Sequence, residues 1–203
     1  FFFHAHAANR DPLWSRGLGD VYKRQDEAIK ETLTILNIYS SFLEEYMGIP
    51  VLKGIKSESE KFAGAVDTYC VEALMQDGKA LQAGTSHFLG QNFAKAFNVQ
   101  FANSNGKMDY VWGTSWGVST RLIGALIMSH SDNNGLILPP NLAPIQVVMI
   151  PIFNSDSEYD AIINLFEKIK TGLLKLNISC KIDERKFHKP GWKFAEYLSL
   201  IHI

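Results

Sequence analysis

Apolar residues recur three or four positions apart between Asp26 and Met47, beginning with Ile29, Leu33 and Leu36. This period places them on one face of a helix. Gly48 follows directly, at the position where many helices end in a left-handed glycine. The pattern therefore predicts a helix over residues 26–47 that ends at Gly48.

Two antiparallel hairpins are predicted next. Val66–Leu74 is rich in strand-forming residues, QDGK at residues 76–79 is a turn, and the chain returns from residue 79 as the partner strand. A second pair of short strands flanks Asn105-Gly106, which is another turn signal. The returning strand of the first hairpin continues into a segment with helical character, so residues 80–97 are expected to begin as a strand and end as a helix.

A further helix is predicted over residues 119–130, with four inward-facing residues. These are Leu122, Ile123, Leu126 and Ile127. The proline-rich stretch Leu136–Pro144 then marks the expected domain boundary, at residues 139/140. Beyond it, an apolar run over 145–153, an amphipathic helix over 158–176 and a second apolar run over 178–183 form a βαβ pattern, which favours a parallel sheet.

Two hexapeptides, one near each end of the chain, form an unusual pair. The codons CTG TCT CTT ATA CAC ATC encode LSLIHI at residues 198–203, and their reverse complement encodes DVYKRQ at residues 20–25. One DNA word read on opposite strands is typical of a sequencing adapter. We therefore exclude residues 1–25 and 198–203 from the fold prediction and expect residues 1–25 to be disordered. The remaining chain is divided into domains at 26–139 and 140–197.

Composition narrows the class of protein. A hydrophobic content of 46% with 20% charged residues describes a globular protein with a buried core. The net charge of −1 provides no overall attraction to nucleic acid or membranes, although it does not exclude a local basic patch. Cys70 and Cys180 match no metal-binding spacing, so no metal site is predicted. No apolar run reaches the ~18 residues that span a bilayer.

Candidate chemistry is concentrated in two segments. Gln82, Thr85 and His87 cluster where the strand of residues 80–97 gives way to a helix. Arg121 follows Ser119 in the first turn of the 119–130 helix, where its guanidinium and the backbone N–H groups of the helix suit an anion. Both segments also have ordinary structural interpretations: His87 as a core histidine, and Arg121 as a surface side chain lying along its helix.

The aromatic candidates and the glycine beside one of them, each taken alone, also allow either a structural or a functional interpretation. Phe62, in EKFAG, is most simply a packing residue, and Trp116 belongs to a strand in which core packing is the plain interpretation. Gly117, next to it, allows a ligand to approach the backbone closely.

The order of these segments along the chain favours the functional interpretation over the structural one. Three consecutive segments together resemble prolyl-tRNA synthetases of the archaeal/eukaryotic type, which are class II aminoacyl-tRNA synthetases. The segments are KGIKSESEKFAGAVDTYCVEAL, GKALQAGTSHFLGQNFAKAFNVQF and YVWGTSWGVSTRLIGALIMSHSDNNGLILPPNLAPIQVV. DERKFHKPGWKFAEY resembles their anticodon-binding domain. The resemblance implies an α+β fold: part of the antiparallel-sheet catalytic domain of a class II synthetase, followed by part of an α/β anticodon-binding domain.

The resemblance also implies roles for individual residues. Arg121 is similar to the motif 3 arginine that holds the ATP phosphates, and is the one residue assigned a catalytic role. The remaining residues are assigned by resemblance to two subsites: ATP-binding, Gln82, Thr85 and Ser119; and proline-binding, Phe62, His87, Trp116 and Gly117. By the same resemblance, Gln82 and Thr85 help to order a magnesium ion.

The implied reaction is ATP-dependent ligation of L-proline to tRNA(Pro) through prolyl-adenylate, with Mg²⁺, in a cytoplasmic homodimer that does not associate with membranes. Motifs 1 and 2 precede Asp26 in the family and are not found here, so we expect the sequence as written to be an inactive part of an active enzyme. Two alternatives stay open: another class II synthetase, or a non-catalytic synthetase-like regulator that binds tRNA.

Overall fold

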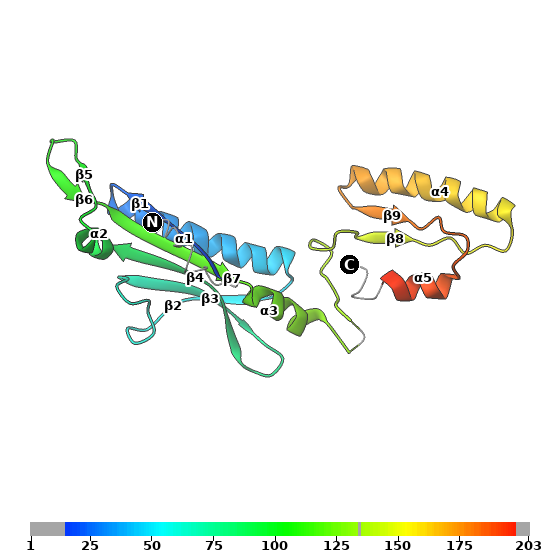
Figure 1. The fold of residues 1–203 in the computed structure, drawn as a ribbon, viewed down its shortest axis with the longest axis horizontal. Coiled ribbons are helices and arrows are strands. Elements are labelled where there is room, and N and C mark those ends of the chain that lie inside the picture. Colours follow the sequence, from blue (N-terminus) through cyan, green and yellow to red (C-terminus); the bar gives the residue numbers. More distant parts are fainter. Residues whose placement is uncertain (1–14, 134, 198–203) are drawn as a thin grey trace, which may run out of the picture. The chain divides into compact units, whose positions relative to one another are not determined.

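The structure is a computed structural model that describes residues 15–133 and 135–197. It forms two compact units that divide after Ser129 (Figure 1). This division comes earlier than the predicted boundary at residues 139/140. The predicted boundary lies in the irregular stretch between α3 (Arg121–His130) and β8 (Val147–Met149).

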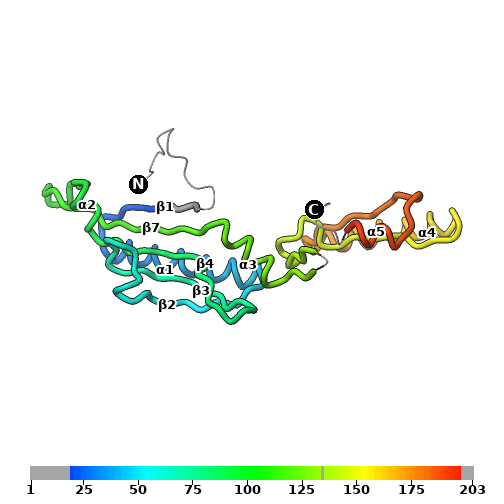
Figure 2. Tube along the Cα trace, turned by 60° about the horizontal axis from the view of Figure 1, so that its bottom comes forward, coloured from blue at the N-terminus to red at the C-terminus, as the bar shows by residue number. Residues whose placement is uncertain are grey.

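The first unit is built on a five-stranded antiparallel sheet with the order β1-β7-β4-β3-β2. β1 lies at one edge and β2 at the other (Figure 2). The strands are β1 (Ser15–Tyr22), β2 (Val51–Ile55), β3 (Asp67–Leu74), β4 (Ala80–Gly90) and β7 (Trp112–Ser119). The helix α1 (Gln25–Ser41) packs along one face, against β3, β4 and β7.

The predicted first helix is confirmed. α1 is followed directly by a π-helical turn, η1 (Phe42–Tyr46), so the helical segment covers nearly the whole predicted range. Gly48 then adopts a φ of 62°, and the amide of Ile49 donates to the carbonyl of Leu43 at 2.8 Å. A positive φ with a backward hydrogen bond is the helix ending that glycine permits.

Both predicted hairpins are also present. β3 and β4 pair across a turn in which Gly78 has a φ of 78°, and the short strands β5 (Gln100–Ala102) and β6 (Met108–Tyr110) pair across a turn in which Gly106 has a φ of 71°. β4 continues into the short helix α2 (Asn92–Ala96), which confirms the change from strand to helix.

The expectation that residues 1–25 are disordered is wrong for the described part of that segment. Residues 15–22 form β1, which pairs with β7 from Ser15↔Ser119 to Tyr22↔Trp112. Without β1, the N–H and C=O groups along that edge of β7 would lack a strand partner, and such an edge pairs readily with an extended segment. Gly19 fits because a Cβ there would lie 2.7 Å from the Thr114 carbonyl oxygen. Residues 1–14 and 198–203 lie outside the described residues.

The prediction for the buried face of α3 is only partly right. Leu126 and Ala125 are buried, but Ile123 is 60% exposed and Ile127 is also exposed. The helical period identified an apolar stripe wider than the strip of α3 that is covered by other described residues. Periodicity gives the orientation of a stripe but not the width of its contact.

The second unit contains the predicted βαβ arrangement. β8 and β9 (Cys180–Ile182) pair in parallel, and α4 (Asp156–Lys175) connects them. The hydroxyl of Ser155 caps α4 by accepting the Glu158 amide at 3.3 Å. Tyr159 is buried, and its hydroxyl donates to the carbonyl of Glu184 at 3.0 Å.

The sequence PGWKF begins the helix α5 (Pro190–Tyr197). Proline suits the first position of a helix, because its missing N–H would have no partner there and its φ is already helical. α5 carries Lys193 into the interior, where the side chain is 1% exposed. Its Nζ donates to the Asp183 carbonyl at 3.0 Å and lies 3.4 Å from Asp183 Oδ1.

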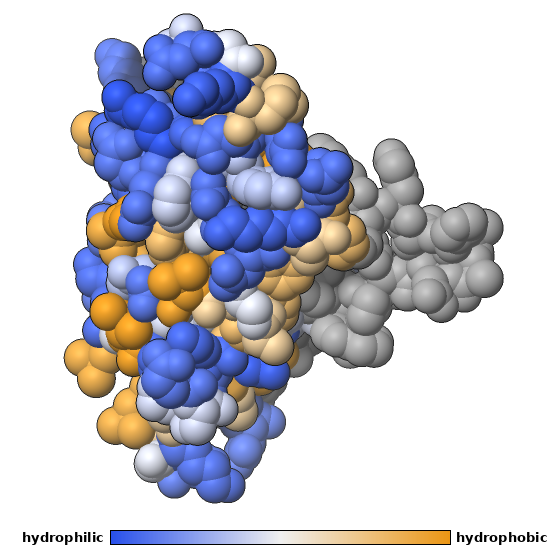
Figure 3. All heavy atoms as spheres, turned by 90° about the vertical axis from the view of Figure 1, so that its left-hand side faces the viewer, coloured by the Kyte–Doolittle hydropathy of each residue, from blue (hydrophilic) through white to orange (hydrophobic). Residues whose placement is uncertain are grey.

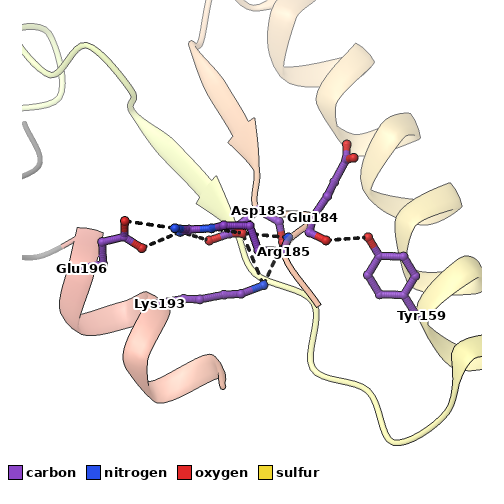
Figure 4. A network of polar contacts seen from close by, with 6 residues as sticks. All are labelled: Tyr159, Asp183, Glu184, Arg185, Lys193 and Glu196. Carbon is purple, nitrogen blue, oxygen red and sulfur yellow. Dashed lines mark hydrogen bonds and ion pairs between the residues drawn. The ribbon is translucent and has the colours of Figure 1, made fainter. Parts of the chain in front are cut away.

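Asp183 is the centre of a charged network that joins β9 to α5 (Figure 4). Arg185 donates to both of its carboxylate oxygens and also to Glu196 of α5. Hydrogen bonds from Arg185, with the nearby charge of Lys193, hold the pKa of Asp183 well below its usual range, although burial acts in the opposite direction. The network therefore keeps a carboxylate charged inside the unit and fixes α5 against the strand end.

Some general properties bear on function. Apolar side chains are interspersed with polar ones on the face seen from the end of the first unit that carries β5, β6 and α2 (Figure 3). Cys70 and Cys180 are free thiols. In the described part of the chain, no helix is both long and apolar enough to cross a membrane.

Candidate active site

The two faces of the five-stranded sheet differ in what covers them. Ser86 Oγ donates to the carbonyl of Thr32 in α1 at 2.9 Å, so Ser86 points toward that helix. Gly84 lies on the same side, where a Cβ would come within 2.9 Å of the Tyr39 ring of α1. Side chains alternate along a strand, so Thr85 and His87 point to the opposite face. We call this opposite side of the sheet the open face.

Three predicted site residues of β4 share the open face. His87 lies opposite Thr68, Thr85 opposite Cys70, and Gln82 opposite Glu72 in β3. Strict alternation would send Gln82 to the other face from Thr85. A register shift between Val71 and Glu72 leaves an extra residue in β4 and restores Gln82 to the open face.

β7 supplies the next row. Gly117 lies opposite Thr85, so Gly117 and, two residues on, Ser119 belong to the open face. Trp116 lies opposite Ser86 and therefore faces α1. The structure thus does not bring the Trp116 side chain together with His87, and the expectation that it lines the same pocket is corrected. Adjacent residues of one strand cannot both project from the same face.

Phe62 and His87 form the best-defined part of the open face. Their ring centroids are 4.8 Å apart with an interplanar angle of 37°, although they are 25 positions apart in the chain. Thr68 Oγ1 lies 3.0 Å from His87 Nδ1 and accepts the Phe62 backbone N–H at 3.0 Å. Phe62 is 47% exposed, so one side of this aromatic wall is open to a ligand.

Burial lowers the pKa of His87 below its ordinary value. Burial favours the uncharged imidazole because the charged ring loses its hydration. At neutral pH, the ring therefore acts as a hydrogen-bonding group without a positive charge.

Arg121 lies beside the other end of β4, next to Gln82. It is the first residue of α3 and is exposed, and its Nη1 donates to the carbonyl of Gln82 at 3.3 Å. Its backbone N–H donates to Ser119 Oγ at 3.3 Å. Gln82 and His87 lie opposite Glu72 and Thr68, which are four positions apart in β3, or roughly 13 Å along an extended strand. The guanidinium and the imidazole are thus held at two ends of one surface, a spacing suited to an elongated ligand with an anionic end.

Sequence reasoning missed three residues of the open face: Lys56, Thr68 and Glu72. Lys56 Nζ lies 3.4 Å from Glu72 Oε1, and both line a hollow of about 500 Å³ beside β2. The alternation of polar residues through VDTYCVE could have indicated that Thr68 and Glu72 share a face. Their position opposite His87 and Gln82 depends on the hairpin register, which includes the bulge.

The described residues contain no group of three or more His, Cys, Asp or Glu side chains arranged to hold a metal ion. Glu72 is the carboxylate directly opposite Gln82, and Lys56 already neutralises it. Mg²⁺ keeps several waters and is often held mainly by substrate phosphates with one or two protein oxygens. The donor set near Gln82 and Thr85 fits such a phosphate-borne ion and does not form a protein cage.

Comparison with known proteins identifies the family. No protein-family model matches the chain. A proline–tRNA ligase of Flavobacterium psychrophilum is 61% identical over 185 residues, which make up 91% of this chain and 37% of the relative. A proline–tRNA ligase of Amoebophilus asiaticus is 60% identical over 185 residues, 91% of this chain and 38% of the relative. The chain belongs to the prolyl-tRNA synthetase family.

A solved prolyl-tRNA synthetase has a similar fold. The enzyme from Cryptosporidium parvum, complexed with L-proline and AMP, matches with a TM-score of 0.79 and 38% identity over 91% of this chain and 38% of its own. The predicted fold class, an antiparallel class II synthetase sheet with helices, is confirmed. The chain spans a little over a third of the length of the prolyl-tRNA synthetases it matches.

The matched length bears on the segments assigned to adapters. The match to the Flavobacterium psychrophilum relative covers 185 residues, whereas residues 26–197 number 172. At least 13 matched residues therefore lie in the segments that the sequence interpretation had set aside. Together with β1, this shows that excluding the whole of residues 1–25 and 198–203 removed too much.

Proposed function

We propose that the full-length protein to which this sequence belongs ligates L-proline to tRNA(Pro), using ATP and passing through prolyl-adenylate. The observation that carries this proposal is the 61% identity over 185 residues with a proline–tRNA ligase. The likeness to a synthetase complexed with L-proline and AMP supports both a proline subsite and a nucleotide subsite. The open face offers an aromatic end and a cationic end that suit these two ligands.

In the first step, a carboxylate oxygen of proline attacks the α-phosphorus of ATP, an O–P bond forms, and the bond to pyrophosphate breaks. The carboxylate is already a nucleophile and pyrophosphate is already a leaving group, so no protein group needs to transfer a proton. The protein contributes alignment of the two reactants and stabilisation of the negative charge that develops between them.

Arg121 is proposed to hold the ATP phosphates. Its guanidinium is permanently charged and forked, and it is oriented by the Gln82 carbonyl at 3.3 Å. Gln82 and Ser119 lie at this end of the open face, and Thr85 lies between it and the aromatic end; we assign all three to the nucleotide. A magnesium ion carried by the phosphates would neutralise part of their charge.

Phe62, His87 and Gly117 are proposed to form the proline end. The Phe62 ring offers a flat apolar surface to the pyrrolidine ring, and Gly117, opposite Thr85, leaves room beside the strand. Trp116 is assigned a supporting role, because it lies opposite Ser86 and faces α1 from the strand that carries Gly117.

In the second step, a ribose hydroxyl at the 3′ end of tRNA(Pro) attacks the carbonyl carbon of prolyl-adenylate, and AMP leaves. We assign recognition of the anticodon to the second unit, in keeping with its βαβ fold and the exposed aromatic Phe187. We further propose that the full-length protein is a cytoplasmic homodimer.

The test is amino-acid-dependent exchange of pyrophosphate into ATP by the full-length protein, assayed with each amino acid in turn. We expect exchange with proline and much weaker exchange with others. Exchange with another amino acid at a higher rate would assign the protein to a different class II synthetase. Binding of tRNA without any exchange would make it a non-catalytic tRNA-binding protein.

A further inference from the structure

Thr68 is a buried polar residue that the proposed reaction does not use directly. It lies in β3, it is 2% exposed, and it faces His87 across the strand pair. A buried hydroxyl is costly unless its hydrogen-bonding groups are satisfied. The partners of Thr68 are therefore informative.

The hydroxyl of Thr68 can donate one hydrogen bond and accept two. It accepts the backbone N–H of Phe62 at 3.0 Å, and it lies 3.0 Å from His87 Nδ1. Among the described residues, the structure provides no other acceptor for the Thr68 hydroxyl proton. Nδ1 is therefore the acceptor, and the neutral imidazole carries its own proton on Nε2.

We propose that Thr68 is a positioning residue that holds His87 as the Nε2–H tautomer and ties it to the loop that carries Phe62. This inference rests on the proposed function for its consequence in catalysis. Its structural content, the tautomer and the shared hydrogen bonds, concerns these residues alone. Thr68 acts through its neighbours and does not itself contact the substrate.

The tautomer determines which part of proline His87 can bind. An Nε2–H group donates a hydrogen bond, which suits an oxygen of the proline carboxylate or, after activation, the carbonyl oxygen of the adenylate. The imino nitrogen of free proline is protonated and is itself a donor, so it cannot accept from Nε2–H. We therefore assign His87 to orienting the carboxylate that attacks ATP.

The link to Phe62 adds a second role. The Phe62 amide is fixed by Thr68, the Phe62 carbonyl accepts the Ala65 amide at 2.9 Å, and Gly64 completes the turn with a φ of 89°. Thr68 thus anchors the loop at the residue whose ring packs on His87. Loss of its hydroxyl should disturb the tautomer and the aromatic wall together.

The first experiment measures the His87 ring nitrogens by NMR in this chain and needs no catalytic activity. We expect the proton on Nε2 in the wild type and in Thr68→Ser, which keeps the hydroxyl, and a mixture of tautomers in Thr68→Val, which has the same shape without it. Thr32→Val is the matched control, because Thr32 is also a fully buried threonine, but its hydroxyl donates only to the Ala28 carbonyl within α1. A wild-type ring protonated on Nδ1 would overturn the inference, even if Thr68→Val failed to fold.

The second experiment uses the full-length protein and pyrophosphate exchange. Thr68→Val should raise the KM for proline roughly tenfold while the KM for ATP stays near its wild-type value, as expected for one lost buried hydrogen bond. Thr68→Ser should restore most of the loss. Equal changes in both KM values, or no rescue by serine, would reduce Thr68 to a general structural role.

The two proposals fail in different ways. If the wild-type protein shows no proline-dependent exchange, the proposed function is wrong, while the NMR result still decides the tautomer. If exchange occurs and Thr68→Val is indistinguishable from wild type in KM for proline, the positioning role is wrong and the proposed function stands.

Discussion

Replacement of Lys193 by methionine tests the charged network of the second unit. Lys193 Nζ bonds the Asp183 carbonyl at 3.0 Å and lies 3.4 Å from its carboxylate, and both side chains are 1% exposed. Removing one member of a buried ion pair typically costs about 3–5 kcal/mol. Arg185 remains bound to Asp183 in the variant, so the loss is closer to that of a single hydrogen bond to a charged group, about 1.5–3 kcal/mol. We expect Lys193→Met to lower the free energy of unfolding of this unit by about 2 kcal/mol.

The assay is urea unfolding combined with hydrogen exchange at the amides of β9 and α5, which reports on this unit. The matched control is Lys186→Met, which removes an exposed ion pair with Asp156, 2.8 Å long. Exposed pairs contribute little to stability, so the control should change the unfolding curve slightly or not at all. If Lys193→Met is no more destabilising than Lys186→Met, the network does not stabilise α5 and the reasoning from burial is refuted.

Three further predictions follow from the first unit. In the full-length protein, Arg121→Ala should lower proline-dependent exchange by about tenfold to a few hundredfold, because hydrogen bonds to charged groups contribute about 1.5–3 kcal/mol each; an unchanged rate in a kinetic assay would remove Arg121 from the nucleotide subsite. The free energy of unfolding should fall as the pH drops below about 6.5, the ordinary histidine pKa. The reason is that His87 takes up a proton in the unfolded state, whereas burial resists its protonation in the folded state. The fall should level off once the pH is below the lowered pKa of His87. Urea titrations across this range should show that slope in the wild type and lose it in His87→Gln; equal slopes would contradict the assignment. Gly84→Ala should destabilise the first unit by about 1–3 kcal/mol, because the added Cβ would lie 2.9 Å from the Tyr39 ring and 3.3 Å from Val118 Cγ1. The control is Gly54→Ala, where an added Cβ meets no atom within 4 Å. Equal melting temperatures of the two variants would argue against this packing.

Features that depend on a few neighbouring residues could be predicted from the sequence. The turns at Gly78 and Gly106 and the helix end at Gly48 each need only a local glycine that adopts a positive φ. The βαβ pattern of the second unit likewise follows from two apolar runs around an amphipathic helix. In these cases the local sequence and the fold require the same conformation.

The arrangement of the site was less accessible to sequence reasoning. Gln82 reaches the face of Thr85 only through the bulge in β4, which no alternation of polar residues announces. The pairing of Thr68 with His87 depends on the register of the same hairpin. Trp116 is different, because strand alternation alone would have separated it from Gly117 and corrected its assignment to the pocket.

The edge of the five-stranded sheet shows another limit of prediction from the sequence. β1 forms because β7 presents an edge that an extended segment can pair with, and this is a property of the folded partner. The exposed Ile123 and Ile127 of α3 show the same dependence, since the extent of burial is decided by neighbouring elements. Such features are set by tertiary contacts, which lie outside any local pattern.

The central claim is that one sheet face binds proline beside His87 and Phe62 and the nucleotide phosphates beside Arg121. A crystal structure of the full-length protein with a non-hydrolysable analogue of prolyl-adenylate tests it most directly. We predict the pyrrolidine ring against Phe62, the acyl oxygen in hydrogen-bonding distance of His87 Nε2, and the phosphate group toward Arg121. An analogue bound on the α1 side of the sheet, or away from β4 altogether, would contradict the account.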